Sequence, residues 1–189
     1  VTSEFPHETG GLLTILELAK SGDTIIFDPQ LFLYRLELHE SLSIDKAITI
    51  DADALEYGLE ITPKFSSGIS LFINTQASGL PVQFRNVIFQ DLRANGPAPI
   101  TLGEGDLICN RCSFFINASG HSNTEQAGAI YSHGGDVALI NSHFFGNHSE
   151  ISTNPDAGMI YSGHGSLAMV NSVAIANGFH ELNDTALFN

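Results

Sequence analysis

Short apolar runs recur in the C-terminal half of this 189-residue chain at a fixed spacing of 30 residues. Residues 106–109 (DLIC) align with 136–139 (DVAL) and 166–169 (SLAM), and the register continues on both sides. A period of this length, built from short apolar runs, is typical of stacked units that pack only on their neighbours. We therefore interpret residues 99–189 as three register-matched repeats, of which the last is incomplete.

Each repeat has room for three strands separated by Gly, Asn, Asp and Ser turns. In a parallel β-helix each strand pairs with its equivalent one coil along, about 4.8 Å away, so inward positions form columns. The sequence predicts an all-β, right-handed parallel β-helix of about six coils, a single domain over residues 1–189. The expected apolar columns are Ile100, Ile130 and Ile160; Leu107, Val137 and Leu167; Cys109, Leu139 and Met169; and Phe115, Phe145 and Ile175.

The N-terminal segment has the only clear helical pattern. Leu12, Ile15, Leu16 and Ala19 share one helical face, which predicts a helix over residues 10–22. Thr9 is the expected N-cap, and Gly22 the expected stop. A helix over 9–22 would cover the exposed strand edges and apolar interior of the first coil. Upstream of the repeats, strands are expected at 24–27, 35–38, 47–51, 59–62, 70–73, 82–84 and 87–89.

The charge of the chain narrows its possible partners. The formal net charge is -14, and no Lys or Arg follows Arg111. Nucleic acid and anionic membranes both need cationic contacts, so neither is an expected partner. No apolar run approaches the roughly 18 residues of a membrane span, so membrane insertion is not expected. The start at Val1 suggests a mature or excised form.

Two motifs carry a resemblance to a known family. Residues 127–130 (AGAI) and 157–160 (AGMI), with the FxxN sequence at 144–147, resemble the GGAI and FxxN repeats of polymorphic outer-membrane proteins. Residues 1–63 look like the opening of bacterial extracellular β-helix domains that carry such repeats. The resemblance implies a secreted or surface-exposed right-handed β-helix that serves as a passenger, stalk or adhesive segment.

The FxxN asparagines allow two interpretations. Asn117, Asn147 and Asn177 occupy one coil position, where inward side chains would hydrogen-bond along a ladder. Asn117, Asn147 and Asn183 also begin glycosylation sequons. An inward ladder residue cannot carry a glycan, so the two interpretations exclude each other at each site. Asn183 lies outside the ladder.

Cysteine, histidine and aspartate offer further candidate sites. Cys109 and Cys112 could be buried thiols or a disulfide, since the helix of a redox motif and the second pair of a zinc site are missing. The histidines of the repeats fall at different coil positions and are expected in solvated loops. Asp106 and Asp136 align one coil apart and could hold Ca²⁺, or be solvated turn residues. No other cofactor is expected.

An enzymatic function is the competing interpretation, because some polysaccharide lyases and hydrolases are β-helices. The best carboxylate pair for a hydrolase is Asp51 and Asp53, about 7 Å apart on an extended strand. Only Arg85, Arg93 and Arg111 could serve a lyase. Asp91 and Glu104 are scattered in loops, and segments 91–98 and 118–127 could wall a modest cleft.

The sequence therefore favours a non-catalytic, secreted or cell-surface β-helix with a structural or adhesive role. It would be either a surface segment that binds a receptor or glycan, or a filament subunit that self-associates through its terminal coils. Ala186, Leu187 and Phe188 begin a coil that is not closed, and an unpaired edge can recruit another chain. The alternative is a carbohydrate-binding or carbohydrate-cleaving β-helix.

Overall fold

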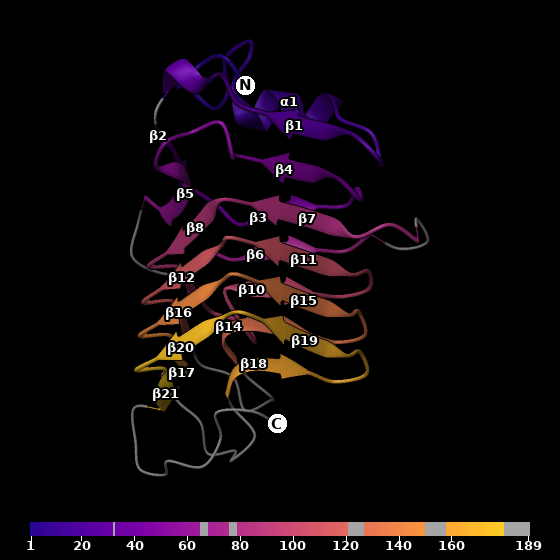
Figure 1. The fold of residues 1–189 in the computed structure, drawn as a ribbon, viewed down its shortest axis with the longest axis vertical. Helices are drawn as coiled ribbons and strands as arrows, with labels where there is room; N and C mark the ends of the chain where they lie inside the picture. The colour runs from indigo at the N-terminus through magenta and orange to yellow at the C-terminus, as the bar shows by residue number, and fades with distance from the viewer. Residues whose placement is uncertain (32, 65–67, 76–78, 121–126, 150–157, 180–189) are drawn as a thin grey trace.

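The chain forms an all-β parallel solenoid with one α-helix near its N-terminus, as seen in a computed structural model (Figure 1). The structure describes residues 1–31, 33–64, 68–75, 79–120, 127–149 and 158–179. Every strand pair among these residues is parallel, and each joins equivalent strands of neighbouring coils. The predicted fold class is confirmed.

Four sheets, A to D, run along the solenoid, and within one repeat the chain visits them in the order A, B, D, C. Sheet A contains β1 (Thr24–Ile26), β4 (Thr49–Asp51), β7 (Val82–Arg85), β11 (Leu107–Asn110), β15 (Val137–Ile140) and β19 (Leu167–Val170). Sheet B contains β2 (Leu33–Leu38), β5 (Gly58–Pro63), β8 (Val87–Gln90), β12 (Ser113–Phe115), β16 (His143–Phe145) and β20 (Val173–Ile175).

The other two sheets are smaller. Sheet D contains the two-residue strands β9 (Arg93–Ala94), β13 (Ala118–Ser119), β17 (His148–Ser149) and β21 (Gly178–Phe179). Sheet C contains β3 (Leu42–Ile44), β6 (Leu71–Ile73), β10 (Ile100–Leu102), β14 (Ala127–Ser132) and β18 (Gly158–Ser162). A short 3₁₀ turn, η1, spans Pro29–Leu31.

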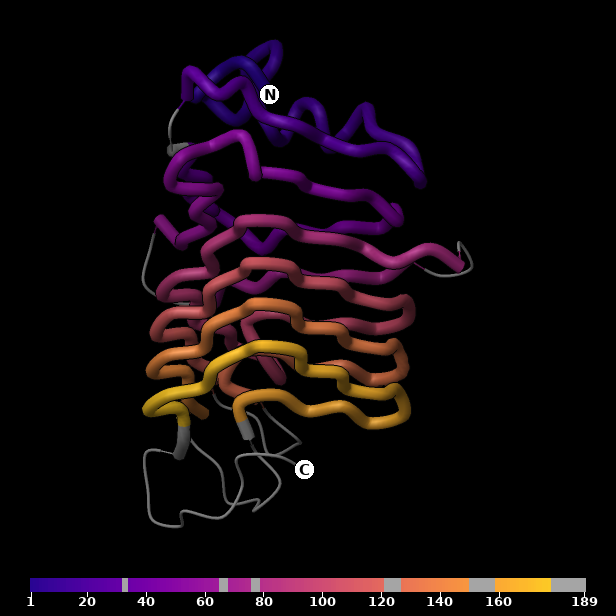
Figure 2. The backbone as a smooth tube through the Cα atoms, viewed as in Figure 1, coloured from indigo at the N-terminus to yellow at the C-terminus, as the bar shows by residue number. Residues whose placement is uncertain are grey.

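The structure changes two details of the predicted repeat. Each regular coil has four strands rather than three, because the two-residue strands of sheet D are too short to show a periodic pattern. Sheets A and B hold six strands each, but sheet D, within the described residues, holds four. The solenoid therefore has about four regular turns, slightly fewer than the six predicted. Figure 2 shows these turns stacked along the long axis of the molecule.

Three of the four predicted core columns are confirmed. The column that begins at Ile100, the one at Leu107 and the one at Cys109 all pair in the expected register, and their central members are fully buried. These side chains belong to one continuous hydrophobic core that runs through the coils. The stacked columns of inward side chains thus form the hydrophobic core of the solenoid.

The fourth predicted column is wrong by one residue. Phe115, Phe145 and Ile175 are 37%, 43% and 57% exposed, whereas Phe114 and Phe144 are buried and stack with ring centroids 4.2 Å apart. Strict alternation from Cys109 would turn Phe115 inward. However, the corner residue Arg111 adopts the left-handed conformation (φ 57°), and this extra outward residue shifts the alternation by one position.

The N-terminal helix α1 (Leu12–Leu18) is shorter than predicted and is capped differently. Gly11, not Thr9, is its N-cap, and no side chain caps this end. A side chain at residue 11 would collide with the carbonyl oxygens of Phe5 and Pro6, so the preceding segment fixes the helix start. The helix ends at Ala19, where Lys46 donates hydrogen bonds to the carbonyl oxygens of Leu16 and Glu17, at 3.0 and 2.9 Å.

Helix α1 lies at one end of the solenoid, across the first coil (Figure 1). Leu12 is fully buried, and its backbone N–H donates to the hydroxyl of Tyr34 on β2. The pKa of Tyr34 is raised, chiefly because the hydroxyl is partly buried. Gly22, the predicted stop, lies beyond the helix in the left-handed conformation (φ 94°) and turns the chain into β1. The predicted capping role of the helix fits this position.

Candidate functional sites

The FxxN asparagines form a buried hydrogen-bonded ladder between sheets B and D. Asn117 donates from Nδ2 to Oδ1 of Asn147 (2.8 Å) and to the carbonyl oxygen of Phe89 (3.0 Å). Asn147 repeats this pattern one coil later, donating to Oδ1 of Asn177 and the carbonyl oxygen of Phe114, both at 2.8 Å. Each Oδ1 also accepts a backbone N–H, as from Leu92 to Asn117 (3.0 Å).

The ladder bears on the two interpretations of Asn117 and Asn147. Asn117 is 1% exposed and Asn147 is 0% exposed, and both hydrogens of each Nδ2 are used inside the solenoid. A glycan at either position would have to replace these hydrogen bonds and leave the interior. Of the two interpretations of Asn117 and Asn147, the structure therefore supports the inward ladder. Asn183 lies outside the described residues.

The two cysteines are buried free thiols rather than a disulfide. Cys109 takes the column position of Leu139, as the repeat predicts. Cys112 takes the position of Ser142, whose hydroxyl accepts the backbone N–H of Cys112 at 3.3 Å. Burial, with a smaller effect from a hydrogen bond to Cys112, raises the pKa of the Cys109 thiol well above its usual range. Both thiols are fully buried in the folded chain.

Asp106 and Asp136 hydrogen-bond the backbone of the following coil. Oδ1 of Asp106 accepts the N–H of Asp136 (2.9 Å), and Oδ1 of Asp136 accepts the N–H of Ser166 (2.8 Å). The backbone hydrogen bond from Ser166 lowers the pKa of the Asp136 carboxyl. Within the described residues no group of three or more His, Cys, Asp or Glu side chains is arranged to hold a metal. Because Oδ1 of each carboxylate accepts a backbone N–H of the next coil, that oxygen has a structural role.

The carboxylates and arginines weighed for catalysis pair with one another. Asp51 pairs with Arg85 at 3.2 Å, and Asp53 pairs with Arg111. Arg93 pairs with Asp91 at 3.3 Å. A glycosidase needs two carboxylates facing a common substrate. The structure instead directs Asp51 and Asp53 towards two different arginines.

A polar groove of about 540 Å³ lies at the corner that joins sheet C to sheet A. Its walls include Glu104, Gly105 and Asp106 of one coil, and His133 and His164 of the next two coils. The two imidazole rings meet edge to face, with centroids 5.7 Å apart. Thr75 and Leu80, from the connection between β6 and β7, complete the groove. In Figure 2 the described ends of that connection extend further outward than the turns below.

The sequence interpretation missed this groove. The sequence pattern places Glu104 in a loop and the histidines at different coil positions in solvated loops. His133 and His164 differ by 31 residues, so a strict 30-residue alignment places them in different columns. The two turns have equal length, because Ser132 pairs with Ser162 and Val137 with Leu167, so the rings meet from neighbouring turn positions. The only usable signal was the high density of Gly around them, which marks turns that stack.

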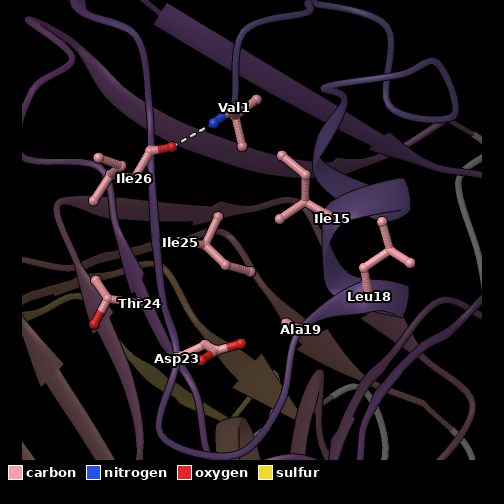
Figure 3. Close-up of a pocket in the computed structure, with 8 residues that line it drawn as sticks. All are labelled: Val1, Ile15, Leu18, Ala19, Asp23, Thr24, Ile25 and Ile26. Atoms are coloured by element: carbon pink, nitrogen blue, oxygen red, sulfur yellow. Dashed lines mark hydrogen bonds between the residues drawn. The ribbon is translucent and has the colours of Figure 1, made fainter.

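A second hollow, of about 410 Å³, lies between α1 and the outer edge of β1. Figure 3 shows Ile15 of the helix pointing towards Ile25 of β1, with Val1 at one end of the hollow and Ala19 at the other. Val1 donates to the carbonyl oxygen of Ile26 and accepts from the N–H of Asp28, which is the pattern of a parallel bridge. Val1 thus covers part of the edge of β1.

Apolar side chains gather on the outer surface of the last described coils, where His143 is an exposed polar neighbour. We call this surface the apolar flank, and it consists of Phe115, Ile116, Phe145, Val170, Val173 and Ile175, each 37–57% exposed. The outward residues of β2 and β5 in the same sheet include the ion pair of Arg35 with Glu60. The outer face of sheet B therefore changes from charged to apolar along the solenoid.

These features define a parallel β-solenoid with a helix across its first coil and a hydrogen-bonded asparagine ladder inside. No known protein family, curated protein or solved structure matches the chain. Among the described residues, no helix has the length and apolar character needed to cross a membrane.

Proposed function

We propose that this chain is a non-catalytic, extracellular β-helix with a structural or adhesive role, a passenger or stalk segment like those of the polymorphic outer-membrane proteins. The apolar flank is the observation that carries the proposal. Contiguous exposed apolar side chains are uncommon on proteins that remain monomeric, and they mark surfaces that bind a partner. The flank is mainly aromatic and aliphatic, with His143 beside it, and such a composition is typical of interface centres.

We propose that the chain is not catalytic because the candidate polar groups among the described residues have structural partners. The inward asparagines and the Asp106–Asp136 pair bond the backbone of neighbouring coils. Asp51 and Asp53, the best hydrolase candidates, are engaged by Arg85 and Arg111. Structural use of these groups supports a stalk whose surface, rather than a reactive site, is its functional part.

A flank variant tests the proposal. The full chain would be coupled to beads and scored for retention on a panel of immobilised matrix proteins and glycans. The double variant Phe115→Ser, Phe145→Ser should lose retention, because both exposed rings of the flank are removed. Tyr57→Ser is the matched control, since Tyr57 is 61% exposed outside the flank. Equal retention of both variants, or turnover of any glycan on the panel, would contradict the proposal.

Self-assembly is the other version of the structural role. The predicted assembly edge at Ala186, Leu187 and Phe188 lies outside the described residues. Negative-stain microscopy and light scattering of the unmodified chain separate filaments from monomers. Filaments that persist in the flank double variant would favour assembly through the terminal coils, whereas a monodisperse monomer at high concentration would exclude it.

A further inference from the structure

The chain contains two Asn-Gly pairs in different surroundings. Asn95 and Gly96 lie in a bend that follows β9, whereas Asn177 and Gly178 lie where the inner ladder meets β21. An asparagine before a glycine is chemically labile, because glycine has no side chain that keeps its backbone nitrogen away from the asparagine amide. The two pairs have the same sequence, so their surroundings decide which of them reacts.

The pair at residues 95 and 96 is not held. Asn95 is exposed, and within the described residues neither its side chain nor the backbone N–H of Gly96 has a hydrogen-bond partner. The residue before the pair is fixed, because the carbonyl oxygen of Ala94 accepts the N–H of Gly120 at 2.6 Å. The bend is therefore anchored at its start, while the two groups that would react with each other make no hydrogen bond.

The second pair is held by the inner ladder. Nδ2 of Asn177 donates to the carbonyl oxygens of Phe144 (3.0 Å) and Ile175 (3.1 Å). Its Oδ1 accepts both the backbone N–H and the Nδ2 of Asn147, at 2.9 and 2.8 Å. The following residue, Gly178, belongs to β21. A reaction at Asn177 would first have to break these hydrogen bonds, so the fold protects this side chain.

We propose that Asn95 is a site of spontaneous modification, at which the side-chain amide becomes a carboxylate. The backbone nitrogen of Gly96 loses its proton and bonds to Cγ of Asn95, the Cγ–Nδ2 bond breaks, and ammonia leaves from the five-membered ring that has formed. Water then opens the ring. Cleavage of its Cγ–N bond gives aspartate, and cleavage of its other C–N bond gives isoaspartate, whose backbone runs through Cβ and Cγ. Water is the only co-reactant, and base accelerates the first step because it removes the proton.

The isoaspartate product would disturb the stacking of three coils. Gly68 of the preceding coil lies so close to Asn95 that a side chain at residue 68 would come within 2.9 Å of Nδ2. Gly120 of the following coil lies on the other side, where a side chain would be 3.6 Å from Cα of Asn95. An additional backbone carbon has little room between these neighbours. Strands β9 and β13 should therefore be less protected from hydrogen exchange in the isoaspartate form.

Ageing of the full chain tests the proposal. The chain would be incubated at neutral and at mildly alkaline pH, digested with pepsin in acid, and followed by mass spectrometry. The peptide with Asn95 should gain the mass that separates an acid from an amide, and should gain it faster at alkaline pH. In the folded chain Asn95 should react at least about tenfold faster than Asn177. In urea the two rates should converge, because the ladder is lost.

Gly96→Ala is the matched variant. A side chain at residue 96 would meet nothing within 4 Å, so the fold should be kept, which thermal unfolding checks. The variant should slow the reaction of Asn95 about tenfold or more, because a Cβ hinders the approach of the backbone nitrogen. An unchanged mass at Asn95, equal rates at Asn95 and Asn177 in the folded chain, or a rate difference that persists in urea would each overturn the proposal. An unaltered rate in the variant would also overturn it.

Discussion

A single side chain, Asn147, links three successive coils. It accepts the backbone N–H and the Nδ2 of Asn117, and it donates to the carbonyl oxygen of Phe114 and to Asn177. The side chain is fully buried, so its removal would leave its hydrogen-bonding partners unpaired inside the solenoid. A residue of this kind contributes to stability mainly through the groups that it keeps satisfied.

Asn147→Ala should therefore lower the free energy of unfolding by about 2 to 4 kcal/mol, because it leaves several buried donors and acceptors unpaired. The control is Asn110→Ala, since Asn110 belongs to a partly exposed ladder and accepts only a 3.4 Å bond from Asn141. That variant should cost less than about 1 kcal/mol. Urea unfolding followed by circular dichroism measures both, and equal losses would show that the inner ladder has no special role.

Cys109 predicts how stability depends on pH. Its pKa is raised in the folded chain, so the thiolate forms more easily in the unfolded chain. The contribution of the protonated Cys109 thiol to the free energy of unfolding is therefore complete below the unfolded thiol pKa of about 8.5. It is lost as the pH rises above that value. Urea midpoints should be flat between pH 7 and 8, then fall towards pH 10, with a smaller fall in Cys109→Ala. An identical fall in both proteins would assign the effect to other groups.

At the scale of one residue, the sequence could pose the alternatives but not decide between them. Asn117 satisfies both the ladder motif and the sequon, and the two differ only in the direction of the side chain. The repeat predicts the position of each residue along the coil. Whether its side chain points inward is known only from its burial and its hydrogen-bond partners in the structure. Glu104 and His133 were missed for a similar reason, because their proximity depends on how two turns stack.

At the scale of a strand, β16 shows how an Arg or Asn corner decides which aromatic residue enters the core. Phe144 stacks on Phe114 with an angle of 3° between the rings, whereas Phe145 faces solvent. The corner residue Asn141 has φ 51°, and the equivalent Asn171 has φ 48°. Two consecutive Phe residues hide this choice from a pattern of period two, so the predicted fourth column was displaced by one position.

Exchanging the two aromatic positions tests the register. Phe144→Ala should destabilise the chain by about 3 to 5 kcal/mol, because it opens a cavity in the column between Phe114 and Ala174. Phe145→Ala should change stability by less than about 1 kcal/mol. Because the two variants remove the same side chain from adjacent positions, their difference reports the direction of each ring. A larger loss for Phe145→Ala would reverse the register of sheet B.

At the scale of the whole molecule, the solenoid depends on contacts between neighbouring coils. Every strand pair among the described residues joins equivalent strands of neighbouring coils, and the sequence period predicted this architecture because each coil repeats the same inward positions. The ends of the solenoid were harder to predict. Helix α1 starts where Phe5 and Pro6 pack on Gly11, a contact between loop and helix that leaves no periodic trace.

The described coils should differ in local stability along the axis. Leu139 and Phe144 are buried in one coil, but their equivalents one coil later, Met169 and Ala174, are partly exposed. Local opening requires less free energy where fewer apolar contacts are lost. Native-state hydrogen exchange with mass spectrometry should therefore show stronger protection in β15 and β16 than in β19 and β20. The coil of β11 and β12, which has described neighbours on both sides, is the internal reference. Equal protection of all three coils would mean that the solenoid opens as one cooperative unit and not coil by coil.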